Sequence, residues 1–153
     1  MSAHRLNSQQ HGFTLLELLI VIVIIGILAL LIIPNITSAP KKARDTKRKT
    51  DIVTLRKALE EYFVNNNVYP PSSGTVGTGG VLAELTTGSA PIVKTLPTDP
   101  KNASPYVYTY TPANSNSTYT LNACLENDSD SGGNVIAPVA PCTTKTFQVI
   151  NSN

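Results

Sequence analysis

Gly12-Phe13-Thr14-Leu15-Leu16-Glu17 opens the stretch that decides the fold of this 153-residue chain. The run from Phe13 to Ile33 has 21 residues, and Glu17 is its single charged side chain. A helix of that length, at about 1.5 Å per residue, spans a hydrocarbon core of about 30 Å. The run is longer than the apolar part of a secretory signal, which has about 7–15 residues. The sequence therefore predicts a retained helix that spans a membrane.

Glu17 needs a physical reason, because a carboxylate costs several kcal/mol at the centre of a bilayer and such groups are functional candidates. The apolar run contains no cation that would neutralise this charge. A cut between Gly12 and Phe13 would create an α-amino group beside it, and that amine on one copy can neutralise Glu17 of a neighbouring copy. The alternative is that Glu17 reaches the headgroups or is protonated there.

These residues also resemble a known family. Gly-Phe-Thr-Leu-Leu-Glu before an unbroken hydrophobic helix resembles the class III signal of type IV prepilins and of type II secretion pseudopilins. The resemblance implies cleavage between Gly12 and Phe13 by a prepilin peptidase, methylation of the new Phe13 amine, and use of Glu17 in assembly. It also implies that the stretch between Gly26 and Pro34 can melt in an assembled filament.

The pattern divides the chain into four parts: a leader at 1–12, a transmembrane or filament-core helix at 13–34, a stalk with an amphipathic helix at 35–64, and a globular head at 65–153. Pro34 and Pro40 predict a short break between the helices. In the second helix, apolar residues recur at three- and four-residue steps and predict a stripe that lies on the head. The upstream half of that helix is polar all round, and we expect it to project from the head or to contact other subunits.

The head is expected to contain antiparallel strands. Residues 106–111, 118–124 and 146–150 are rich in Thr, Tyr and Val and alternate or cluster as strands do. Strands after one long helix predict an α+β fold in which the helix crosses one face of a small sheet, as in pilins. Leu96-Pro97-Thr98-Asp99-Pro100 resembles the segment that leads into the sheet of major pseudopilins.

Two cysteines, Cys124 and Cys142, lie in the C-terminal part of the chain. We expect them to form a disulfide if the head lies outside the cytoplasm, and to remain free thiols if it does not. The nearby loop at 127–134 is rich in oxygen ligands, so Asp128 and Asp130 are candidate calcium ligands. A plain turn is the reading that we prefer for this loop, and we expect no cofactor.

Composition argues against catalysis. Both histidines, His4 and His11, lie in the leader, so a cleaved chain has no Ser-His-Asp or Cys-His arrangement. The basic stretch at 41–49 can meet the phosphates of anionic lipid or of DNA. DNA binding has little support, however, because no aromatic side chains interleave with these charges. We predict that the protein is not an enzyme.

We interpret the chain as a structural subunit, a pilin or a pseudopilin, of a type IV pilus-like filament. It would be made as a single-pass precursor of the cytoplasmic membrane with its head outside, and then enter a periplasmic or extracellular filament. The expected partners are membrane lipid before assembly, prepilin peptidase, other copies or other pilins, and, indirectly, an assembly ATPase and a platform protein. The alternative is an uncleaved single-span membrane protein whose basic segment faces the cytoplasm, which is the orientation that the positive-inside rule favours, and binds nucleic acid or anionic lipid.

Overall fold

A computed structural model describes residues 12–36, 38–77, 80–88 and 90–151 of the chain, with the backbone alone for residues 31–36. The chain divides into two compact units, residues 1–37 and residues 38–153. Of the predicted leader, only Gly12 belongs to the described residues.

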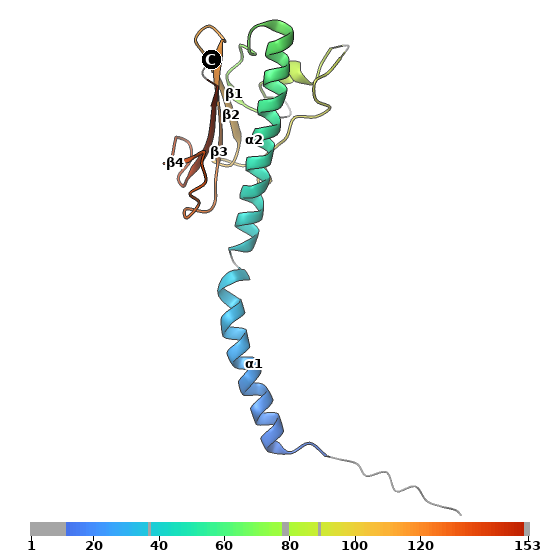
Figure 1. Ribbon diagram of the computed structural model, residues 1–153, viewed down its shortest axis with the longest axis vertical. Helices are drawn as coiled ribbons and strands as arrows, with labels where there is room; N and C mark the ends of the chain where they lie inside the picture. Colours follow the sequence, from blue (N-terminus) through green and yellow to red (C-terminus); the bar gives the residue numbers. More distant parts are fainter. Residues whose placement is uncertain (1–11, 37, 78–79, 89, 152–153) are drawn as a thin grey trace, which may run out of the picture. The chain divides into compact units, whose positions relative to one another are not determined.

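The first unit contains the helix α1, Leu15–Ile36 (Figure 1). Its first residues are apolar apart from Glu17, as the sequence predicts. Gly26 and Pro34 both belong to this helix, so the stretch that they border is helical in the single chain. Whether that stretch melts in a filament stays a prediction.

The helix α2, Ala39–Asn66, begins the second unit, so the predicted break between two helices is confirmed. Ser38 occupies the N-cap position, its carbonyl accepts the Lys42 N–H at 3.1 Å, and proline is tolerated in the first turn because no intrahelical donor is needed there. The helix ends at Asn67, whose left-handed backbone (φ 57°) lets its N–H donate to the Phe63 carbonyl at 2.7 Å. Asparagine tolerates this conformation better than most residues do.

Within the described residues, five antiparallel strands form the sheet, in the order β1-β2-β3-β5-β4. Their bounds are β1 Gly74–Thr75, β2 Tyr108–Ala113, β3 Thr118–Cys124, β4 Val135–Ile136 and β5 Thr146–Asn151. The three strands that the sequence predicts are therefore confirmed, with shifts of one or two residues at their ends. The two-residue edge strands β1 and β4 are too short to carry a periodic signal in the sequence.

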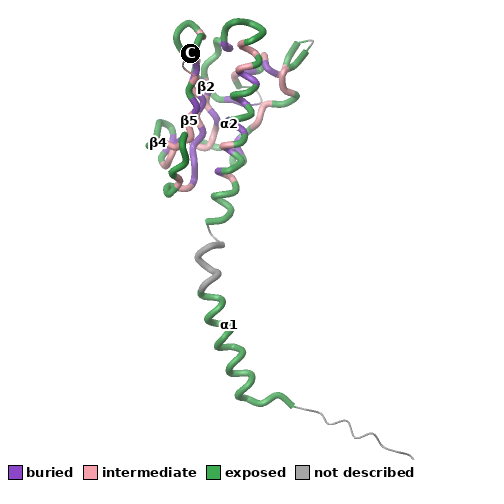
Figure 2. The backbone as a smooth tube through the Cα atoms, viewed as in Figure 1, coloured by how far each residue is buried: buried purple, intermediate pink, exposed green. Residues whose placement is uncertain are grey.

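The α+β fold is confirmed, because α2 packs along one face of the sheet (Figures 1 and 2). Alternate strand residues such as Tyr119 and Leu121 point toward the helix and meet its buried stripe, which includes Ile52, Leu55 and Leu59. The short 3-10 helix η1, Ala83–Leu85, adds Leu85 to this core from the β1 side. Burial of these side chains is the main stabilising contribution to the second unit.

Cys124, at the end of β3, forms a disulfide with Cys142, and their Cα atoms lie 5.2 Å apart. The bond closes a segment with a sequence separation of 18 residues, which contains β4 and the loop before it. Hydrogen bonds connect this segment to β5: the Gln148 N–H donates to the Asn134 carbonyl at 2.9 Å, and the Val139 N–H donates to Thr146 Oγ1 at 3.0 Å. The disulfide therefore limits the freedom of this segment in the unfolded chain.

We expect the double substitution of Cys124→Ser and Cys142→Ser to lower the free energy of unfolding by about 3 kcal/mol, because the unfolded chain regains the freedom of this loop. Urea unfolding of the full chain in detergent, followed by circular dichroism, measures the change. The wild-type protein unfolded under reducing conditions should lose a similar amount. Unfolding midpoints that stay the same in both cases would contradict the prediction.

Candidate functional site

The N-terminal motif lies at the exposed start of α1. Gly12, Phe13 and Thr14 precede the helix, and the Phe13 side chain is 86% exposed. The peptide bond between Gly12 and Phe13 is therefore outside regular structure and next to a helix end. This position makes the bond accessible to a protease.

Glu17 closes a capping box with Thr14. The Thr14 backbone N–H and hydroxyl donate to Glu17 Oε2, each at 2.9 Å, and the Glu17 N–H donates to Thr14 Oγ1 at 3.2 Å. Two of the backbone donors that a helix N-terminus leaves unpaired are thus satisfied, and the negative charge lies at the positive end of the helix dipole. The Thr-x-x-Glu spacing at 14–17 is a capping-box signal that is visible in the sequence.

Beyond this box, α1 presents apolar side chains on all sides. Leu15, Ile22 and Leu30 are between 60% and 89% exposed, and a methyl group added at Gly26 would meet no atom within 4 Å. In the part of the chain that the structure describes, no helix combines the length and the hydropathy of a membrane span. The prediction that residues 13–34 cross a membrane therefore stays a prediction.

A second polar site lies inside the head, around Arg48 of α2. This guanidinium is fully buried and donates to Asp99 at 2.6 and 3.0 Å, to Asp45 at 2.8 Å and to Glu126 at 2.8 Å. It also lies over the ring of Tyr106, with Cζ 4.7 Å from the ring centroid. A buried charge is stable only where partners and hydrogen bonds compensate it, and Arg48 has three carboxylates.

Further ion pairs extend this network. Arg44 donates to both carboxylate oxygens of Glu126 at 2.7 Å, and Lys101 pairs with the same carboxylate at 2.9 Å. The Asp45 carboxylate accepts the backbone N–H groups of Glu126 and Asn127, at 2.9 to 3.1 Å. Among the described residues, no buried side-chain N or O atom is left without a hydrogen bond. The network therefore attaches the upstream half of α2 to two distant loops.

The prediction that this half of α2 projects from the head was wrong. Asp45, Arg48 and Asp51 are buried because hydrogen-bond partners reach them from the loops and from β2: Asp99 and Glu126 accept from Arg48, the Glu126 N–H donates to Asp45, and the Tyr108 hydroxyl donates to Asp51 at 2.8 Å. Such polar residues look the same in sequence whether they face water or an ionic core. The positive charge of this segment is largely neutralised within the chain.

Near the end of α2, Glu60 is the centre of a second polar cluster. Its carboxylate accepts hydrogen bonds from the Tyr69 and Tyr119 hydroxyls and from Asn151 Nδ2, each at 2.9 Å. Burial, followed by the neighbouring Glu60, raises the pKa of Tyr69 to about 12, so this hydroxyl stays protonated and remains a donor at neutral pH. The cluster joins the helix end to β3 and β5.

The residues proposed for calcium take different roles in the structure. Asp130 Oδ2 lies 2.6 Å from Lys49 Nζ, and this contact lowers the pKa of the carboxyl group. Asp128 is exposed in the same loop. Within the described ranges, no group of three or more acidic, histidine or cysteine side chains is arranged to hold a metal ion. The lysine provides the positive charge that Asp130 faces.

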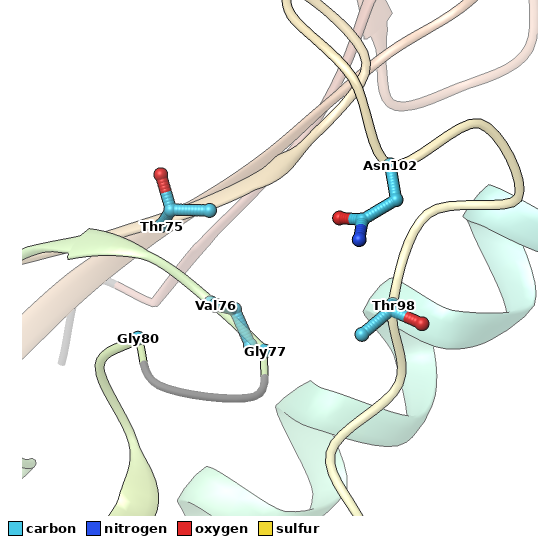
Figure 3. A pocket seen from close by; sticks show the side chains of 6 residues that line it. All are labelled: Thr75, Val76, Gly77, Gly80, Thr98 and Asn102. Atoms are coloured by element: carbon cyan, nitrogen blue, oxygen red, sulfur yellow. The ribbon is translucent and has the colours of Figure 1, made fainter.

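A small cavity of about 100 Å³ lies between the loop after β1 and the loop before β2 (Figure 3). Its lining residues are Thr75, Val76, Gly77, Gly80, Thr98 and Asn102. None of these side chains titrates near neutral pH, so the cavity lacks an acid or base for catalysis.

Comparison with known proteins finds a matching family model for each of the two parts of the chain. Residues 7–33 match the family model described as the prokaryotic N-terminal methylation motif, and residues 35–137 match the one described as type II secretion system protein G. Proteins named type II secretion system core protein G are similar in sequence: that of Aeromonas hydrophila is 40% identical over 99 residues, covering 60% of this chain and 68% of the relative. That of Escherichia coli K12 is 46% identical over 69 residues, which cover 45% of this chain and 48% of the relative. That of Pseudomonas aeruginosa is 38% identical over 107 residues, which cover 65% of this chain and 73% of the relative. The matched segment is thus about half of the E. coli relative and two thirds or more of the other two. No solved structure matches the chain.

The ionic network makes the stability of the head dependent on pH. Hydrogen bonds from Arg44, and then from Arg48 and Lys101, hold the pKa of Glu126 well below its ordinary value of 4.5. A depressed folded-state pKa means that this carboxylate stabilises the fold above pH 4.5 and that its contribution is lost as pH falls from there toward the folded-state pKa.

Glu126→Gln should therefore lower the free energy of unfolding by about 2–4 kcal/mol at neutral pH, and the variant should lose less further stability than the wild type below about pH 4.5. Urea unfolding across this pH range measures both effects. Asp128→Asn, which removes an exposed acid of the following loop, is the matched control and should change neither. Parallel pH profiles for Glu126→Gln and the wild type would show that the carboxylate does not have this role.

Proposed function

This chain belongs to the type II secretion system protein G family, and we propose that it serves as a pseudopilin subunit that is cleaved after Gly12 and polymerises through α1. The family is one of structural proteins, so the interpretation as a filament subunit is confirmed at that level. Membership of this family also favours a pseudopilin over a pilus subunit, the two possibilities that the sequence left open.

The observation that supports the proposal most directly is the arrangement at the start of α1. The Gly12–Phe13 bond lies outside the helix, and Glu17 is attached to Thr14 through a single carboxylate oxygen, Oε2. After cleavage, the ammonium group of Phe13 in a neighbouring copy can approach the other oxygen without breaking the capping box. Glu17 can then cap its own helix and neutralise a neighbour at the same time.

The apolar surface of α1 supplies the driving force for assembly in this proposal. Its side chains lie exposed in the single chain, so they require lipid before assembly and other copies of the helix afterwards. A head-to-tail contact with an open rotation produces a fibre. The charge on Glu17 disfavours registers in which no amine meets it, because an unpaired carboxylate in an apolar bundle is costly.

The head is consistent with a location outside the cytoplasm. Cys124 and Cys142 are joined, and disulfides persist mainly in oxidising compartments. We infer that the precursor is anchored in the cytoplasmic membrane with this head outside and that the filament is periplasmic. In this proposal, prepilin peptidase processes the chain, other pseudopilins join it in the filament, and an assembly ATPase and a platform protein act indirectly.

The alternative, an uncleaved membrane protein that binds nucleic acid or anionic lipid, is not favoured. Arg44, Lys47, Arg48 and Lys49 all form ion pairs within the head, so most of the positive charge of the basic stretch is neutralised there and only Lys41 and Lys42 have no ion-pair partner among the described residues. Binding to phosphates depends on such free charges.

Intact mass and N-terminal sequencing of the protein extracted from native membranes test the processing step. We expect a chain that begins at Phe13 and carries the additional mass of one methyl group. A Gly12→Val variant, which places a β-branched side chain at the cleavage position, should remain uncut. A start at Met1 or Ser2 in cells with active prepilin peptidase would contradict the proposal.

Three variants separate the two roles of Glu17. Glu17→Ala should leave membrane insertion intact but strongly reduce the yield of sheared filament, because it removes both the cap and the charge. Glu17→Gln retains an acceptor for the capping box but not the charge, so it should also reduce the yield. Thr14→Ser, which retains the hydroxyl, should assemble as the wild type does.

Normal filament yield from Glu17→Gln would refute the pairing with the Phe13 amine. The subunit level in the membrane, measured by immunoblot, shows that each variant is made and inserted.

A further inference from the structure

A groove of about 350 Å³ lies on one flank of α2, lined by Val53, Arg56, Lys57 and Glu60. Val53 is 41% exposed, although valine in a packed helix is usually buried. Glu60, at one end of the groove, is hydrogen-bonded to Asn151 of β5, so the groove lies on the side of α2 that faces the β5 edge of the sheet.

The groove carries a net positive charge, from Arg56 and Lys57 against Glu60. Arg56 and Lys57 have no ion-pair partner among the described residues, whereas Lys47 and Lys49, upstream on the same helix, are each paired at 2.6 Å. Glu60 offsets part of their charge but forms no ion pair with either, because its carboxylate oxygens accept hydrogen bonds from the neutral side chains of Tyr69, Tyr119 and Asn151. The exposed Val53 side chain lies in the same groove as the two cations, so the groove is complementary to a small apolar side chain next to a carboxylate.

Such a pair of residues lies on the opposite edge of the head. Ala83 is exposed in η1, and Glu84 beside it is half-buried without an ion-pair partner in the described part of the chain. Leu82 and Leu85 are fully buried and anchor this turn, and the Val81 N–H donates to the Thr75 carbonyl of β1 at 2.9 Å. The acid therefore lies beside β1, whereas Glu60 of the groove is hydrogen-bonded to β5, on the other side of the sheet order.

We propose that Glu84 of one copy docks in the Arg56–Lys57 groove of the next copy, as a contact between heads in the filament. The inference rests on the proposed function and names the partner of this surface as a second copy of the chain. Complementary patches on opposite edges of one subunit make a heterologous contact, which does not close on itself and can repeat along a fibre. Val53 and Ala83 would partly exclude water from the ion pair between Glu84 and the Arg56–Lys57 groove. Such a pair fixes the register between neighbouring copies better than a fully exposed pair does.

The other acids without a partner fit this geometry less well. Glu61 belongs to α2 itself, on the exposed side of the helix. Asp128 lies in the loop that leads to β4, at the same edge of the sheet that the groove faces. A contact through Asp128 would bring two equivalent edges together and favour a closed pair of copies over a fibre.

A charge-reversal experiment in the native host tests the contact. We expect Arg56→Glu and Glu84→Lys each to reduce the yield of sheared filament about tenfold, because each places like charges opposite one another. The double variant, in which the charges are exchanged, should recover most of the wild-type yield. Glu61→Lys and Lys94→Glu are matched reversals elsewhere on the head and should have little effect.

Protease resistance of the membrane-extracted subunit shows that each variant is folded. Wild-type yield from both single reversals, failure of the double variant to recover, or rescue of Arg56→Glu by Asp128→Lys would each overturn the contact. Filament formation by the wild type and its loss in Glu17→Ala identify these as failures of the head contact alone. A wild type that makes no filament would overturn the proposed function, and this inference with it.

Discussion

The fold of the head depends on the buried guanidinium of Arg48. Three carboxylates surround this one cation: one belongs to α2 and two belong to separate loops. The guanidinium can therefore be buried only when the helix and both loops pack against one another. The desolvation of so many charges is costly, and removing one partner leaves the others uncompensated. Such an arrangement contributes less to net stability than to the choice of one register for α2 on the sheet.

This network also explains why a basic segment next to an apolar helix does not mark a phosphate-binding surface here. Arg44 and Arg48 have guanidinium groups that point into the head, and Lys47 and Lys49 are paired with carboxylates. Among the described residues of α2, the cations without an ion-pair partner are Lys41 and Lys42 in the first turn and Arg56 and Lys57 farther along. The charged side chains that remain available to other molecules are therefore those that form no ion pair within the head.

The two units meet different physical requirements. Among its described residues, the second unit satisfies its buried side-chain polar atoms and buries a core of apolar side chains. In the first unit, Thr14 and Glu17 accept hydrogen bonds from backbone N–H groups at the start of α1, but the apolar side chains of this helix remain exposed. A chain with one self-sufficient head and one helix that needs neighbours is suited to polymerisation, and membership of the protein G family agrees with this.

Much of this protein follows from local sequence. The apolar run, the break near Pro34 and Pro40, the stripe of α2 and the three long strands depend on periodicity and on residues with restricted backbones, so they can be predicted without the fold. The order around Gly12 and Glu17 likewise defined the N-terminal motif. The short strands β1 and β4 could not be predicted, because two residues carry no period.

Only the tertiary structure decided where the charges lie. Arg48 binds Asp99 and Glu126, at sequence separations of 51 and 78 residues, and nothing near these residues indicates the pairing. A run of lysines and arginines looks the same in the sequence whether its side chains are exposed to water or are paired with carboxylates that lie far away in the chain. The sequence therefore determined the helices, the main strands and the N-terminal motif, whereas burial of one cation among remote acids determined that the upstream half of α2 also packs into the head and which of its positive charges are paired there.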